Sequence, residues 1–311
     1  MKFVKGGNVS RLLEGISIPK MFHAKQEFDD AKITPEDIPA VVYRELSKPG
    51  IGETIKPGMS IAVTAGSRGV ANVNVITRAI VDFCKEKGAH PFIVPAMGSH
   101  GGALAEGQKE LLAGYDITEE SMGCPIKSSM ETVLLGYSQY GKPVYQDKYA
   151  YEADGIIISC RIKPHNAFRG PYESGVCKMM VVGLGKQTGA ESVHSDGLGN
   201  MARNLPANAR VVLERSSILF AIPCVENAYD ETSIIEAIPR EAIMDREPEL
   251  LKTAFSNMPG ILVGEADVLI VNEMGKNFSG TGVDPNISGT WSTEFGKGGL
   301  KVKRTCFLDL T

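Results

Sequence analysis

This sequence lacks the features that mark several large classes of protein. No apolar run reaches the length of about 20 residues that spans a bilayer, and the opening residues, MKFVKGGNVSRLLEG, contain no apolar secretory core. We therefore expect a cytoplasmic protein without membrane contact. Lysine and arginine number 33 against 37 acidic residues and form no dense cluster, which argues against a nucleic-acid partner. The net charge of −4 leaves a small molecule as the favoured ligand.

Cysteine pairs and the common nucleotide motifs are also missing. The six cysteines lie far apart without a C-x-x-C pair, which disfavours a thiolate zinc site and suits reduced thiols in a reducing compartment. A P-loop would need glycine at Met180, and a Rossmann G-x-G-x-x-G would need it at Thr188. No G-x-S-x-G elbow occurs either. These three motifs are therefore excluded.

The pattern of apolar runs predicts an α/β fold. The 311 residues, 43% of them hydrophobic, suffice for one large or two ordinary domains. Strand, loop and helix alternate from residue 59 onward, which is typical of right-handed βαβ units in a Rossmann-like, parallel or mixed sheet. We expect strands at 16–21, 60–64, 90–95, 156–160 and 267–272, and helices at 35–47, 73–87, 104–112 and 248–255. Segments 132–137 and 143–149 predict a hairpin appended to the sheet.

The richest stretch of the chain runs from Gly155 to His194. Its first residues form an apolar, β-branched run of strand length, which delivers His165 into a loop. Lys178 follows as the lysine set most deeply in an apolar segment, where burial of its ammonium is costly unless it is paired or chemically used. His194 comes sixteen residues later. The chain has only five histidines, so this grouping predicts a functional site.

Four of the predicted strands end in glycine- or proline-containing loops that each carry one cationic or imidazole residue. These residues are Arg68, His100, His165 and Lys276. Because ligands of open parallel sheets bind at the carboxyl ends of strands, we expect the four to meet in one cleft. Their charge predicts an anionic ligand, a carboxylate or phosphate, and two imidazoles suit acid-base catalysis near pH 7.

At this point the sequence resembles the nickel-dependent lactate racemase family, whose members racemise or epimerise 2-hydroxy acids. The resemblance rests on segments that follow the family's order over most of residues 59–282: Gly66-Ser67-Arg68, Gly98-Ser99-His100, Pro164-His165 with Phe168-Arg169-Gly170, Ser174 to Gly183 around Lys178, and His194. Together these motifs are far more specific than any one of them alone.

The resemblance implies a cofactor and its attachment. Family members use a nickel-pincer nucleotide, a pyridinium thioamide/thiocarboxylate mononucleotide that holds nickel. By this resemblance Lys178 is the covalent anchor of the cofactor and His194 is the protein ligand to nickel. We expect no part in metal binding for Lys186 or His23. The enzymes that make the cofactor would be partners of this chain.

The resemblance also implies a mechanism. The Cα hydrogen of a 2-hydroxy acid is too weakly acidic for an unaided imidazole, so inversion proceeds by hydride transfer to and from the cofactor. His100 and His165 would act as the two acid/base groups on opposite faces of the substrate. Arg68 would bind the substrate carboxylate, and Lys276 resembles a substrate-binding lysine of the second domain.

Two departures from the family pattern concern the substrate. The family's first loop usually has an acidic residue three before the arginine, where this chain has Ala65, and the loop from His165 to Lys178 is longer than in the lactate enzymes. Both leave open whether the substrate is a short hydroxy acid or a longer aldonate. Family chains are also longer, so we expect an N-terminal α/β domain at 1–262 with most of the site, and at 263–311 only the start of a second α/β domain.

Two alternatives remain open from the residues alone. One is a catalytically inactive protein of the same fold that binds an organic acid or a nucleotide. The other is a zinc-dependent lyase or hydrolase with His100, His165 and His194 as ligands, since zinc also favours imidazole. No H-x-x-x-H spacing supports the second alternative.

Overall fold

The fold is a mixed sheet between two layers of helices. The computed structural model describes residues 7–17, 20–67 and 69–311. Four strands run parallel in the order β2-β1-β5-β6, and two short strands pair antiparallel with β6 at the far edge. The strands are β1 (Ser60–Ala65), β2 (His90–Pro95), β5 (Gly155–Arg161), β6 (Ile218–Glu226), β7 (Thr232–Ile235) and β8 (Ile238–Pro239).

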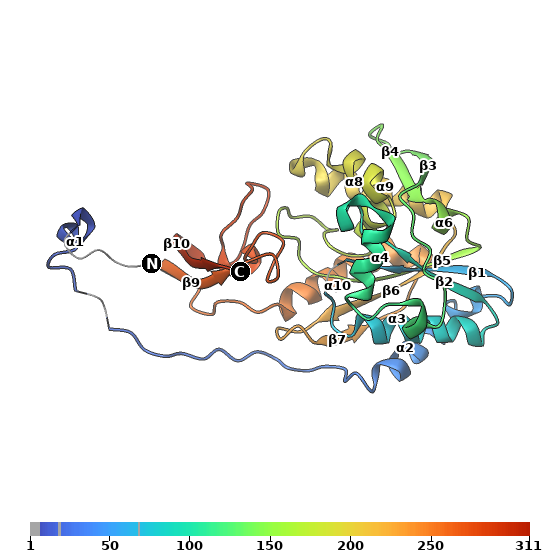
Figure 1. The fold of residues 1–311 in the computed structure, drawn as a ribbon, viewed down its shortest axis with the longest axis horizontal. Coiled ribbons are helices and arrows are strands. Elements are labelled where there is room, and N and C mark those ends of the chain that lie inside the picture. Colours follow the sequence, from blue (N-terminus) through green and yellow to red (C-terminus); the bar gives the residue numbers. More distant parts are fainter. Residues whose placement is uncertain (1–6, 18–19, 68) are drawn as a thin grey trace.

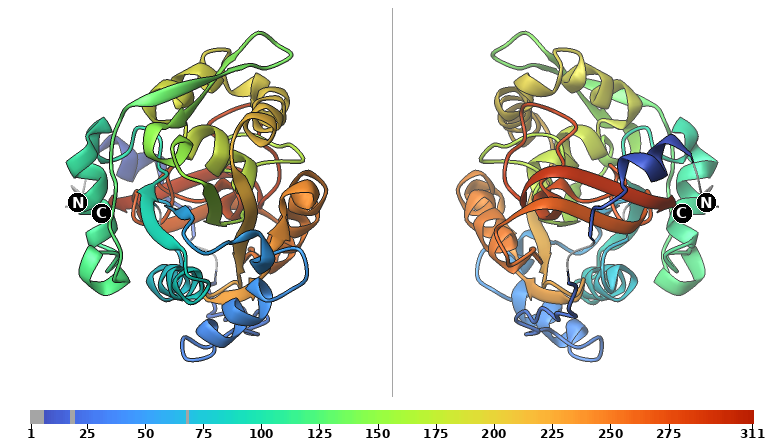
Figure 2. Two further views of the ribbon diagram at one scale, coloured as in Figure 1. Left: turned by 90° about the vertical axis from the view of Figure 1, so that its right-hand side faces the viewer. Right: turned by 90° about the vertical axis from the view of Figure 1, so that its left-hand side faces the viewer.

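The helices pack on both faces of this sheet because its strands are apolar on both sides. In β1, Ile61 and Val63 point to a core shared with α2 and α3, whereas Ala62 between them points to the opposite core. Figure 2 shows the helices on both sides of the sheet. The first layer holds α2 (Ile38–Leu46), α3 (Val73–Glu86) and α5 (Glu119–Met122), and the second holds α7 (Val176–Lys178), α8 (Lys186–His194), α9 (Met201–Arg215) and α10 (Ile243–Asn257). The remaining helices are α1 (Asn8–Leu12), α4 (Ala105–Ala113), α6 (Lys148–Tyr151) and α11 (Pro285–Ser288).

Most of the expected elements are present with small shifts of their ends. The strands expected at 60–64, 90–95, 156–160 and 267–272 all form, as do the four expected helices. The helix expected to start at 35 begins at Ile38, because residues 35–37 form a turn. The strand expected at 16–21 is wrong at its four described positions, where Ile16 and Met21 are exposed and bury too little surface. Residues 18–19 lie outside the described part of the chain.

The expected hairpin forms but does not extend the main sheet. β3 (Thr132–Tyr137) and β4 (Pro143–Asp147) pair only with each other, in an antiparallel sheet with a bulge between Leu134 and Gly136. The hairpin packs against α8 and α9 instead, where Val144 joins the second core. The helices α8 and α9 thus cover the apolar side chains of the hairpin, which lies at the top of the molecule in Figure 1.

The last strands form a separate sheet beside the main one. β9 (Glu265–Met274) and β10 (Lys301–Leu310) pair in parallel, and Figure 1 shows them next to the α/β body. Parallel sheets are normally covered on both faces, yet Val268, Ile270 and Leu308 are exposed. Among the residues described, no helix has the length and apolar character needed to cross a membrane.

Candidate active site

A cavity of about 1070 Å³ opens at the carboxyl ends of the parallel strands. The loops after β1, β2, β5 and β6 line it, together with the start of the loop that follows β9. β1 lies between β2 and β5, so the chain crosses from β1 to one side for β2 and returns to the other side for β5. The cavity therefore occupies the switch point at which open α/β sheets bind their ligands.

Five of the six residues predicted for the site line this one cavity. They are His100, His165, Lys178, His194 and Lys276. Arg68 lies outside the described residues, although its neighbours Ser67 and Gly69 line the cavity. The structure thus brings the predicted loops together, while the role of each residue stays a prediction.

The described lining of the cavity carries one more cationic than anionic side chain. Its cationic side chains are Arg161, Lys163, Lys178 and Lys276, joined by the three imidazoles, against the carboxylates Glu191, Glu226 and Asp230. Glu226 is already paired, because one of its oxygens accepts from Arg161 and the other accepts from the backbone N–H of Ala71 at 2.7 Å. The surplus favours an anionic ligand.

The loop that carries His100 is joined to its two neighbours. The Nδ1 atom of His100 hydrogen-bonds to the hydroxyl of Ser67 in the loop after β1. The backbone N–H of Gly98 donates to Gly183 O at 3.2 Å, in the segment that follows Lys178. An added Cβ on Gly183 would lie 2.7 Å from the carbonyl oxygen of Ala96, so only glycine allows this approach.

A buried carboxylate organises the loop that carries His165. Glu173 accepts from the N–H of His165 at 2.6 Å, from the N–H of Gly170 at 3.1 Å and from Arg169 Nη1 at 3.1 Å. The same guanidinium donates to the carbonyl of His165 at 2.8 Å and stacks over Trp291 at 4.5 Å. The region between β9 and β10 therefore holds this loop from outside.

His165 is a neutral imidazole in this environment. Burial, followed by the positive charge of Lys178, lowers its pKa from 6.5 to about 2. Its Nδ1 accepts from the N–H of Ala167 at 3.1 Å, so the proton of the neutral ring resides on Nε2. His165 therefore presents an N–H donor until that bond to Ala167 is broken.

Lys178 ends a single helical turn that is stabilised by a buried glutamate. Residues Met179–Gly183 continue it as a π-helix, a rare form that is frequent at functional sites. Glu247 of α10 accepts from the N–H of Cys177 at 2.8 Å through Oε2, and its Oε1 has no hydrogen-bond partner within the described residues. Burial raises the pKa of Glu247 from 4.5 to about 7. Lys178 itself is only half-buried. The most buried lysine of the described residues is Lys186, which is fully enclosed.

His194 ends α8 with one ring nitrogen occupied. Its Nδ1 lies 2.7 Å from the carbonyl oxygen of Ala190, which can only accept, so Nδ1 carries the proton. The lone pair of the neutral ring is then on Nε2, as a metal ligand requires. The three imidazoles His100, His165 and His194 do not form a group that could hold a metal ion between them; across the described residues no group of three or more His, Cys, Asp or Glu does so. The zinc alternative therefore gains no support.

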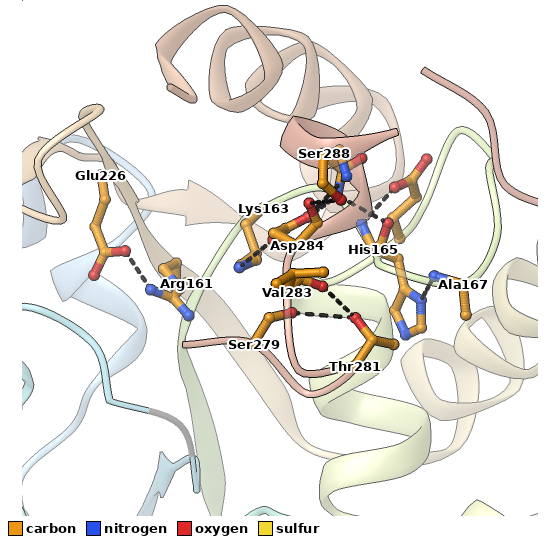
Figure 3. A network of polar contacts seen from close by, with 12 residues as sticks. Arg161, Lys163, His165, Ala167, Glu226, Ser279, Thr281, Val283, Asp284 and Ser288 are labelled. Carbon is orange, nitrogen blue, oxygen red and sulfur yellow. Dashed lines mark hydrogen bonds and ion pairs between the residues drawn. The ribbon is translucent and has the colours of Figure 1, made fainter. Parts of the chain in front are cut away.

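The loop after β9 closes the remaining side of the cavity. Figure 3 shows Lys163 between Arg161 and His165, with the loop that carries Asp284 alongside. Lys163 Nζ pairs with Asp284 Oδ2 at 3.4 Å, and the cavity lining includes Lys276 to Gly280 from the same loop. Lys276 thus reaches the site from a strand outside the main sheet.

Comparison with known proteins agrees with this geometry. Residues 20–204, more than half of the chain, match the sequence model described as the lactate racemase N-terminal domain. The chain belongs to the lactate racemase family. No curated protein matches the chain.

Two solved structures share the fold of this family member. The lactate racemase apoprotein from Thermoanaerobacterium thermosaccharolyticum is 16% identical with a TM-score of 0.57, over 79% of this chain and 60% of that one. A protein from Thermotoga maritima is 14% identical with a TM-score of 0.58, over 81% of this chain and 66% of that one. The chain thus spans about three fifths to two thirds of these proteins, and at such identities the likeness shows the fold.

Four polar residues that hold the site of this lactate racemase family member were not found from the sequence. Gln108, Glu173, Lys186 and Glu247 are all buried. The glycines around Lys186 are the one local signal, because Gly183 and Gly185 allow a close approach of other backbone segments. No local pattern distinguishes Glu173 or Glu247 from surface glutamates, because their partners lie in other segments.

The raised pKa of Glu247 predicts a pH-dependent stability. Between pH 4.5 and about 7 this carboxyl is protonated in the folded chain and ionised in the unfolded one, so stability falls as pH rises through this window. We expect Glu247→Gln, which does not titrate, to remove up to about 3 kcal/mol of this fall. Urea unfolding at pH 5 and pH 7.5 measures it, with exposed Glu241→Gln as control. An equal fall in wild type and Glu247→Gln would contradict the assignment.

Proposed function

We propose that this chain carries the acid/base and cofactor-binding residues of a 2-hydroxy-acid racemase or epimerase that depends on a nickel-pincer nucleotide. One observation carries the proposal: His100 and His165 from two loops, Lys178 from a helical turn and His194 from the end of α8 line one cavity at the switch point of the sheet. Membership of the lactate racemase family supports the same reaction class.

The residues of the cavity fit the proposed cofactor. A volume of about 1070 Å³ accommodates a mononucleotide together with a small acid. Lys178 is the candidate for covalent attachment, and Nε2 of His194 offers a neutral nitrogen ligand to nickel. The positive lining suits a nucleotide phosphate. When bound, such a cofactor supplies the acceptor for the hydride on the substrate Cα.

The side chains of this chain then hold the substrate and move its hydroxyl proton. Lys276, and Arg68 by the family resemblance, would bind the carboxylate. One imidazole takes the hydroxyl proton from one enantiomer, and the other, which already carries a proton, donates that proton to the oxygen of the opposite enantiomer. Burial, and then the positive charges near it, oppose the protonation of His165, and a bound substrate carboxylate would offset the second cause. To act as a base, His165 must also release the hydrogen bond from Ala167, because its Nε2 already carries a proton.

Lys178 is expected to be the attachment point of the cofactor. When the chain is coexpressed with the enzymes that make the cofactor, intact mass spectrometry should show an adduct on the wild type and none on Lys178→Ala. Lys163→Ala, which removes another lysine of the cavity, should keep the adduct. An adduct that persists on Lys178→Ala rules this residue out. An adduct without racemisation of any 2-hydroxy acid favours the binding protein instead.

His194 is expected to hold nickel. His194→Ala should lose stoichiometric nickel without a change in melting temperature, because the side chain is exposed and its only described hydrogen bond is to Ala190 of its own helix. Elemental analysis of the loaded protein measures this, with His23→Ala as the control that keeps its metal. Unchanged nickel in His194→Ala would remove it as a ligand.

His100 and His165 are expected to divide the reaction by substrate face. His100→Ala and His165→Ala should each lower the racemisation rate about 10²- to 10⁴-fold, which is typical of a missing acid or base. In single turnover each variant should fail with a different enantiomer when the keto acid forms. Chiral chromatography measures both. Equal losses with both enantiomers in both variants would show that the imidazoles do not act on opposite faces.

A further inference from the structure

Lys186 is a fully enclosed lysine behind the candidate active site. It begins α8, the helix that ends at His194, and its φ of 55° is uncommon for a residue other than glycine. Its ammonium donates to the carbonyl of Pro95 at 2.5 Å and to Oε1 of Gln108 at 3.0 Å, and it pairs with Asp147 Oδ2 at 3.2 Å. A buried ammonium is costly without such partners, so this cluster is a specific arrangement.

Gln108 connects this lysine with the loop that carries His100. Its Nε2 donates to the carbonyl of Gly98 at 2.9 Å and to the carbonyl of His100 at 3.2 Å. The ammonium of Lys186 cannot accept a hydrogen bond, so it holds the carbonyl end of the amide and turns the NH₂ end to the loop. A flipped amide would set NH₂ against NH₃⁺ and an oxygen against two carbonyls.

The opposite side of the cluster is equally well held. Asp147 is fully buried, accepts from the N–H of Ala150 at 2.9 Å and donates its own N–H to Leu184 O at 2.6 Å. Burial raises the pKa of Asp147 and lowers that of Lys186, while their charges oppose both shifts. The lysine therefore lies between the hairpin, the end of β2 and the helix α4.

We propose that Lys186 and Gln108 are positioning residues that fix the loop of His100 relative to the helix of His194. Two connections join the helix to the loop. Lys186, at the start of α8, donates to Gln108, and Gln108 donates to the carbonyl of His100. The backbone N–H of Gly98 also donates to Gly183, which lies just before α8. The effect on catalysis rests on the proposed function, but the effect on the His100 loop does not.

The test replaces Gln108 and observes His100 in the protein without cofactor. Gln108→Met keeps the length of the side chain and removes both donors, while Gln187→Met makes the same change at an exposed position of α8. With ¹³C at histidine Cε1 and His100→Asn for assignment, the His100 signal should shift or broaden in Gln108→Met. The signals of His165 and His194 should stay, and Gln187→Met should match the wild type.

A second variant separates positioning from loss of packing. Gln108→Glu retains an oxygen for Lys186 but cannot donate to the loop, so we expect the same change in the His100 signal. In loaded protein kcat should fall about 10- to 100-fold in both Gln108 variants with little change in KM, as expected for a misplaced catalytic group. A wild-type His100 signal in folded Gln108→Met or Gln108→Glu overturns the proposal. A changed signal with an unchanged rate upholds the positioning and overturns the proposed role of His100.

Discussion

The parallel alignment of β2, β1, β5 and β6 is the constraint on which the candidate site depends. In this register Ala65 lies opposite Pro95, and Arg161 lies opposite Cys224, so neighbouring strands reach the same edge nearly level. Each loop beyond that edge then starts from a strand that is hydrogen-bonded to at least one neighbouring strand. Residues that are distant in the sequence therefore lie close together at this edge of the sheet.

Buried polar side chains then set the shape of those loops. Each loop or turn is held by one of them: Glu226 for the loop after β1, Gln108 for the loop after β2, Glu173 for the loop after β5, and Glu247 for the turn of Lys178. Glu173 accepts from two backbone N–H groups and Gln108 donates to two backbone carbonyls, and such buried bonds cost much to disturb. The catalytic candidates can therefore stay on loops and still be held in place.

The sequence predicted β1, β2, β5, β9, the hairpin and the ligand-bearing loops because these leave local signals. Apolar runs such as 156–160 bury both faces of a strand, and glycine or proline marks its end. Burial of a single polar residue leaves no such signal. Gln108 and Lys186 form a hydrogen bond although they are 78 positions apart in the sequence, and Glu247 and Cys177 do so across 70 positions. Only the packed fold reveals these pairs. For the same reason the hairpin was recognised while its place over α8 and α9 was not.

The first loop shows how the site differs from the pattern of its family. By the family resemblance the usual acidic residue falls at Ala65, which is 1% exposed at the end of β1, packs in the core with α3 and also borders the cavity. The carboxylate beside this loop comes instead from Glu226 on β6, and Arg161 neutralises it. A paired carboxylate does not repel a substrate anion as an unpaired one does. Glu226 therefore adds no unpaired negative charge to this side of the cavity.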